Sequence, residues 1–132
     1  MTGQKPIWVF DDFEVGQLLG QLSITLDQER LDNWLAIYGA PHPPDRAPSG
    51  LLVAAMMEAY LGAIKPRPPG NVHAGQKLKF GKPVAVGARL DAEVRCLWKE
   101  KRKERGWVGF DVMLRCDGQE VLSGEISSIW AK

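Results

Sequence analysis

The chain has 132 residues, of which 45% are hydrophobic and 25% charged, with a formal net charge of +1. This length suits one domain, residues 1–132, and the near-neutral charge argues against a nucleic-acid binder, whose surface is normally strongly basic. The N-terminus lacks the apolar segment of a secretory signal and Cys96 and Cys116 form no metal motif, so we expect a cytoplasmic protein with no metal, cofactor or membrane partner.

The first half of the chain predicts one strand followed by an amphipathic helix. Residues 21–26 alternate between polar and apolar, which is the period of a half-buried strand. Between Asp27, a predicted N-cap, and Gly39, a predicted stop, apolar residues recur at the i, i+3, i+4 and i+7 spacing of a helix. Four prolines between residues 40 and 48 then predict an extended loop.

The most apolar stretch is Ala47–Ile64, whose single charge after the opening turn is Glu58. Apolar residues cover every side of its helical period, which places the helix inside a protein. We expect Ser49 to cap its start and Pro66 to end it. The stretch is shorter than the roughly 20 residues needed to span a bilayer, so a buried core helix is the better interpretation.

The second half predicts a meander of strands, with no helical period after residue 71. Strands are expected over 72–80, 90–98, 107–116 and 121–130, and the alternation puts Trp98 on the same apolar face as Cys96. The run Lys99–Gly106 is expected to join two of these strands, with a hairpin turn over 116–119. The fold class is therefore α+β, with four to six antiparallel strands wrapped around the apolar helix. Because one sheet covers only one side of that helix, we expect at least a homodimer.

Four segments together resemble the MaoC-like, or R-specific enoyl-CoA hydratase, branch of the hotdog superfamily. They are FEVGQ at 13–17, AIYG at 36–39, RAPSGLLVAAM at 46–56 and LKFGKPVAVGARL at 78–90. The resemblance covers nearly the whole chain. It implies a hotdog fold, in which an antiparallel sheet wraps around a long central apolar helix, and a homodimer or higher homo-oligomer that binds an acyl-CoA or acyl-carrier-protein thioester.

The chain departs from the catalytic motif of that family, Gly-Asp-x-Asn-Pro-x-His. Aligning Gly39 with the motif glycine puts Ala40 where the aspartate should be, His42 at or near the asparagine and Asp45 at the histidine. The Asp/His pair that activates water is therefore degenerate. What remains is the passage into the central helix, where Ser49-Gly50 stands at the place of a pair whose glycine amide polarises the thioester carbonyl.

The candidate catalytic residues are therefore His42, Asp45 and Gly50. An imidazole oriented by a carboxylate suits proton transfer near neutral pH, and unpaired amides at a helix start suit a developing oxyanion. The candidate substrate-binding residues are Tyr38, Ser49 and Leu51. The simpler explanations are that His42 and Asp45 are solvated loop residues, that Ser49 caps the helix, and that Gly50 relieves crowding.

Three functions remain open from the sequence. The first is a hydro-lyase of the hydratase/dehydratase type, and the second is a hotdog thioesterase with Asp45 or Glu58 as base or nucleophile. Burial of Glu58 would raise its pKa, although a paired interface charge is the role that we favour for it. The third is a non-catalytic acyl-thioester-binding or scaffold subunit. The basic run 99–105 could meet coenzyme A phosphates or an acidic carrier protein, but such runs are usually solvated, and we favour that interpretation.

Overall fold

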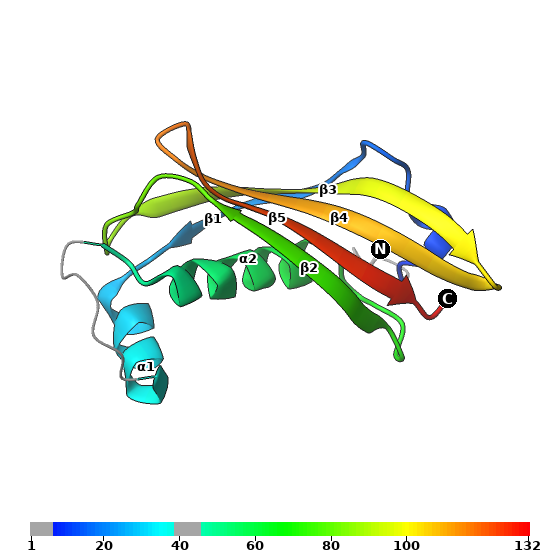
Figure 1. Cartoon of the computed structure of the whole chain (residues 1–132), viewed down its shortest axis with the longest axis horizontal. Helices are drawn as coiled ribbons and strands as arrows, with labels where there is room; N and C mark the ends of the chain where they lie inside the picture. Colours follow the sequence, from blue (N-terminus) through cyan, green and yellow to red (C-terminus); the bar gives the residue numbers. More distant parts are fainter. Residues whose placement is uncertain (1–6, 39–45) are drawn as a thin grey trace, which may run out of the picture.

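The computed structural model describes residues 7–38 and 46–132, which contain five strands, two α-helices and one short 3-10 helix (Figure 1). The strands are β1 (Leu18–Thr25), β2 (Val72–Phe80), β3 (Arg89–Arg102), β4 (Arg105–Cys116) and β5 (Gln119–Trp130). The helices are α1 (Gln28–Tyr38) and α2 (Ser49–Ala63), and the 3-10 helix η1 is Phe10–Asp12. No helix in the described ranges is both long and apolar enough to cross a membrane.

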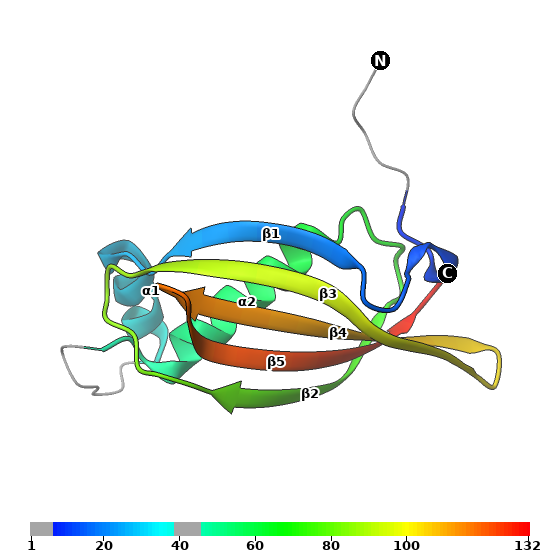
Figure 2. The ribbon, with the colours of Figure 1, turned by 90° about the horizontal axis from the view of Figure 1, so that it is seen from above.

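Within those ranges the strands form one antiparallel sheet in the order β1-β3-β4-β5-β2. The sheet curves over α2, and α1 lies at the end of the molecule where α2 begins (Figures 1 and 2). The predicted arrangement, an antiparallel sheet around an apolar helix, is confirmed. The sequence did not predict that β2 would be an edge strand, because it follows α2 directly yet pairs with β5, the last strand of the chain.

The helix α2 has 15 residues and contacts β1, β3, β4 and β5. Its buried residues are Leu51, Leu52, Ala55, Met56, Ala59 and Tyr60. On the opposite side the described residues cover α2 only in part, where Trp34 and Arg30 of α1 contact Gly50 and Glu58, and Leu61 is 52% exposed. The predicted helix is therefore confirmed, but the described part of the chain buries only part of it.

The start of α1 and the end of α2 lie where the sequence predicted them. In α1, the Asp27 carboxylate accepts a hydrogen bond from the Arg30 amide at 2.9 Å, as an N-cap should. The helix α2 ends at Ala63, before Pro66. Its last carbonyls accept hydrogen bonds from Arg67, whose guanidinium donates to Ile64 O at 2.8 Å and Tyr60 O at 2.9 Å. A cation at a helix C-terminus also interacts favourably with the helix dipole.

Two predictions about the β3–β4 hairpin are wrong. The connection was expected to span Lys99–Gly106, but the strands continue through most of that run and only Lys103 and Glu104 form the turn. Trp98 was expected on the same face as the core residue Cys96. A β-bulge between Cys96 and Trp98 reverses the alternation, so Trp98 lies on the outer face, against Gly109.

Candidate functional site

The start of α2 was predicted to hold the reactive carbonyl of a ligand. The N-cap is Pro48, one residue earlier than predicted, and no side chain caps the helix. Ser49 is therefore the first helical residue. The Leu51 amide, expected to be unpaired, donates to Pro48 O at 3.0 Å, whereas the amides of Ser49 and Gly50 bond to no other residue that the structure describes. Two amides thus remain for an anionic oxygen, at the positive end of the helix dipole.

A cavity of about 130 Å3 opens beside this helix start. It is lined by Arg46, Ala47, Ser49, Leu52, Phe80, Gly81, Lys82, Pro83, Val84 and Val121. The Ala47 amide donates to Val84 O at 2.6 Å, which fixes the segment before α2 against the turn after β2. Arg46 and Lys82 are the basic residues of this lining, and most of the other lining residues are apolar. The volume of the cavity is below the roughly 300–1,000 Å3 of pockets that enclose small molecules.

Gly50 faces Trp34 of α1. A β-carbon on Gly50 would lie 2.8 Å from Trp34 Cζ2, closer than carbon atoms pack, so the indole can lie against the helix start only because Gly50 has no side chain. The ring of Tyr38 packs on Trp34 with centroids 4.9 Å apart. Relief of crowding is therefore a sufficient structural reason for a glycine here. It is compatible with an amide role, because Gly50 is itself exposed.

The structure gathers some predicted site residues and leaves others apart. Ser49 and Gly50 open α2, and Tyr38, 64% exposed, reaches them through Trp34. The Leu51 side chain is 5% exposed and belongs to the core, so only its backbone can face a ligand. His42 and Asp45 lie outside the described residues.

Glu58 does not have the buried environment that a catalytic role was expected to use. Its side chain is 46% exposed and forms a two-pronged ion pair with Arg30 of α1, at 2.6 and 3.0 Å. The hydrogen bond to Glu58 raises the pKa of the Arg30 guanidinium, so Arg30 keeps its positive charge. Glu58 therefore joins α1 to α2, and the premise that burial would protonate it is wrong.

The sequence reasoning missed Phe80 and Lys82 as lining residues of the cavity. Phe80 is the last residue of β2 and Lys82 follows it, both more than 30 positions after Arg46 in the chain, and the hydrogen bond between Ala47 and Val84 brings the two segments together. The segment LKFGKPVAVG had been noted as a family-like passage, but no local pattern indicates that its lysine would face the start of a helix. Only the tertiary contact places it there.

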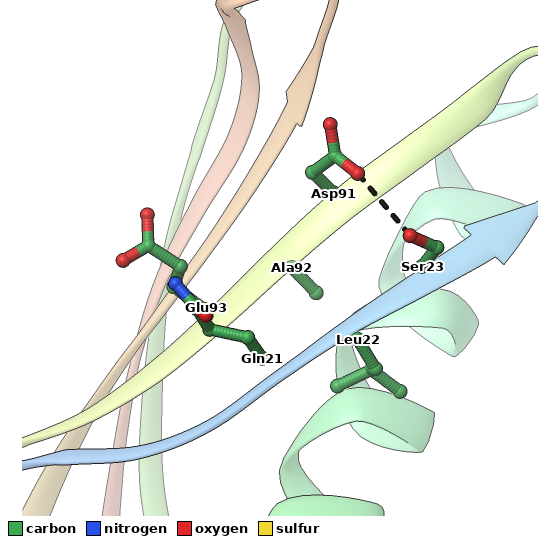
Figure 3. Close-up of a pocket in the computed structure, with 6 residues that line it drawn as sticks. All are labelled: Gln21, Leu22, Ser23, Asp91, Ala92 and Glu93. Carbon is green, nitrogen blue, oxygen red and sulfur yellow. Dashed lines mark hydrogen bonds between the residues drawn. The ribbon is translucent and has the colours of Figure 1, made fainter.

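A second hollow, of about 330 Å3, lies over β1 and β3 (Figure 3). Asp91 and Glu93 point away from α2, whereas Leu22 and Ala92 point towards it. Three of its polar side chains already have partners, since Ser23 donates to Asp91 at 3.2 Å and Glu93 accepts from two arginines. It contains no predicted site residue, and no group in it is placed as a nucleophile or base.

The described residues provide neither a cluster of metal ligands nor a reactive thiol. No three histidine, cysteine, aspartate or glutamate side chains gather there as metal ligands would. Burial raises the pKa of both thiols, Cys96 and Cys116, so at neutral pH they stay protonated and are weak nucleophiles. The start of α2 with its cavity remains the best candidate site.

Comparison with solved structures identifies the fold. The chain is similar to the R-hydratase PhaJ1 of Pseudomonas aeruginosa, with 22% identity, a TM-score of 0.78 and coverage of 92% of this chain and 84% of that one. It is also similar to a MaoC-like dehydratase from Rhodospirillum rubrum, with 16% identity, a TM-score of 0.78 and coverage of 95% and 98%. A third is the HadBC 3R-hydroxyacyl-ACP dehydratase complex of Mycobacterium tuberculosis, with 17% identity, a TM-score of 0.72 and coverage of 87% and 96%.

The fold is therefore the hotdog fold, and the structures it resembles are MaoC-like dehydratases and R-hydratases. No protein-family model matches the sequence, and comparison with curated proteins finds no match either. At these identities the likeness shows the fold, and the chemistry has to be argued from the site.

Proposed function

We propose that this chain is an acyl-thioester hydratase or dehydratase of the MaoC type, acting on an acyl-CoA or acyl-carrier-protein thioester. The observation that carries the proposal is the start of α2, where the amides of Ser49 and Gly50 adjoin a cavity with a cationic lining. Such amides stabilise the negative charge that develops on a thioester oxygen. The likeness to R-hydratase and dehydratase folds supports the same reaction class.

In the proposed hydration, a base removes a proton from water while the water oxygen bonds to the β-carbon of an enoyl thioester. The electron pair of the double bond moves onto the thioester oxygen, which the Gly50 amide holds, and a proton then returns to the α-carbon. His42 or Asp45 is the proposed water-activating group. Ser49 and Tyr38 are proposed to orient the substrate, with Leu51 contributing its backbone.

A second copy of the chain is proposed to complete the site. The edge strand β2 has eight of its nine residues exposed. Leu78 and Phe80 pair with the buried Gly124 and Leu122, so their side chains face the α2 side of the sheet, yet they are 38% and 46% exposed. Leu61 of α2 is a further exposed apolar side chain, and Phe80 also lines the cavity beside the start of α2. A partner chain would cover such exposed apolar side chains.

The reaction is tested by offering crotonyl-CoA and following the loss of the conjugated enoyl absorbance, with DTNB reporting free thiol in parallel. We expect hydration without thiol release. Thiol release would support the thioesterase alternative instead. Silence in both assays across several acyl chains, on CoA and on carrier protein, would leave a non-catalytic binding subunit.

The proposed base is tested by His42→Ala and Asp45→Asn, with His73→Ala and Asp117→Asn as controls at exposed positions. Loss of a general base lowers kcat by roughly 10²–10⁴-fold. We expect one of the two site variants to show that loss while both controls keep their turnover. Unchanged turnover in both site variants would remove these residues from the mechanism.

The proposed dimer is tested by sedimentation of Leu78→Asp beside Val15→Asp, whose parent side chain is also exposed, at 65%. A charge in the apolar surface formed by β2 should shift the protein towards monomer, whereas the control should stay dimeric. A wild-type protein that sediments as a monomer at micromolar concentration would contradict the proposal.

A further inference from the structure

The β3–β4 hairpin concentrates positive charge at one end of the molecule. Its tip, Lys99–Arg105, which we call the basic hairpin, carries five basic and two acidic side chains, a net charge of +3. The other 125 residues carry twelve basic and fourteen acidic side chains, a net charge of −2. The near-neutral total of the chain therefore hides a strong asymmetry between this tip and the rest.

Aromatic rings hold several of these cations in place without neutralising them. On the inner face, Lys99 and Lys101 each lie 4.8 Å from the ring centre of Phe10. On the outer face, the Arg102 guanidinium lies 4.8 Å from the ring of Trp107. Cation–π contacts of this kind fix a charge but leave it available. Among the described ion pairs, only that of Arg102 with Glu100, at 2.7 Å, lies within the basic hairpin.

The turn at the tip is strained. Lys103 and Glu104 have φ angles of 49° and 66°, a region that residues other than glycine, asparagine and aspartate rarely occupy. The β4–β5 turn of the same sheet, Asp117-Gly118, uses a residue pair suited to these angles. A strained turn backbone that is kept, although residues such as Asp-Gly would relax it, suggests a function for the residues present. Here it places a lysine in the turn of the basic hairpin.

The location of the basic hairpin separates it from the candidate site. It projects beyond the other strands at the end opposite the start of α2 (Figure 2). Beside its turn is a hollow of about 250 Å3, lined by Gly70, Val72, Glu104, Arg105, Ile129, Trp130 and Ala131. A cationic tip next to a partly apolar hollow suits a chain segment that carries both acidic and apolar side chains.

We infer that the basic hairpin is a docking surface for an acidic protein segment, with an apolar side chain of that segment entering the adjacent hollow. A free phosphate fits less well, because the cations diverge over both faces and the tip of a projecting hairpin and do not converge on one point. A nucleic acid fits less well, because the rest of the chain has a net negative charge that would repel its phosphates. A membrane would need apolar groups at the tip, where the turn residues are Lys103 and Glu104.

The test is fluorescence anisotropy of a labelled eight-residue peptide with six glutamates and two leucines. The wild-type chain is compared with Lys101→Gln/Lys103→Gln/Arg105→Gln in the basic hairpin and with Lys65→Gln/Lys77→Gln/Lys79→Gln as a control of equal charge change. We expect at least a tenfold weaker affinity for the hairpin variant and less than a twofold change for the control. Equal losses in both variants, or none in the hairpin variant, would overturn the inference.

Two further measurements identify the occupant. A peptide with glutamine in place of glutamate should not bind, and an eight-nucleotide RNA, coenzyme A and phosphatidylserine vesicles should each bind more weakly than the acidic peptide. Tighter binding of any of these three would overturn the protein partner. Lys103→Asn/Glu104→Gly keeps the net charge of the tip but relaxes the turn, so it should raise Tm while weakening the peptide affinity. Unchanged affinity would show that the lysine at the tip is not used.

Discussion

The core hydrogen bond between Tyr60 and Ser128 offers the sharpest test of how α2 is held under the sheet. The two hydroxyl oxygens are 2.8 Å apart, and the residues are 2% and 3% exposed. Replacing Ser128 by alanine leaves the Tyr60 hydroxyl buried without its protein partner. Replacing Tyr60 by phenylalanine leaves the Ser128 hydroxyl buried without its protein partner. It keeps the aromatic ring and the contact of that ring with Arg67.

An unsatisfied buried hydroxyl destabilises a protein by about 1–3 kcal/mol, whereas removal of both partners is nearly neutral. We therefore expect each single variant to lose about 2 kcal/mol, and the double variant Tyr60→Phe/Ser128→Ala to lose less than either single variant, well below their sum of about 4 kcal/mol. An unfolding entropy of about 2.1 cal/mol/K per residue makes 2 kcal/mol equal to about 7 °C in Tm for a chain of 132 residues.

The assay is thermal and urea unfolding of all four proteins at one fixed concentration, because association would make Tm depend on concentration. A double-mutant cycle then isolates the pair. If the two single losses add, the hydroxyls do not depend on each other, and the argument that this hydrogen bond anchors α2 fails. If the single variants lose under about 0.5 kcal/mol, water replaces the missing partner and the site is not dry.

Two further changes test other contacts. Arg67→Met removes both hydrogen bonds to the last carbonyls of α2 and should cost about 2–3 kcal/mol, with Arg67→Lys intermediate; equal stability of the three proteins in urea would contradict the capping role. Burial raises the pKa of Asp111, so its folded pKa lies above the unfolded value. Its favourable contribution is present below the ordinary value near 3.9 and is lost as pH rises through the folded pKa. Asp111→Asn should therefore raise Tm at pH 7 and change it little at pH 3, and the reverse pattern would refute the sign.

The candidate site was only partly accessible to prediction. The helix start at Ser49 and Gly50 could be located because prolines, a glycine and an apolar run follow one another in a short segment. The cationic lining could not, since Arg46 and Lys82 are 36 positions apart in the sequence and meet only because Ala47 bonds to Val84. The catalytic assignment of His42 and Asp45 stays a prediction.

What the sequence alone determined is the type and order of the elements, because helical and strand periods and turn residues are local properties of a segment. It determined α2 from its continuous apolar surface and the β4–β5 hairpin from Asp117-Gly118. The tertiary structure alone decided the outward turn of Trp98, the ion pair that holds Glu58, and the exposed edge at β2. Each of these depends on which distant segments lie side by side, and that choice rests on pairing and packing across the whole chain.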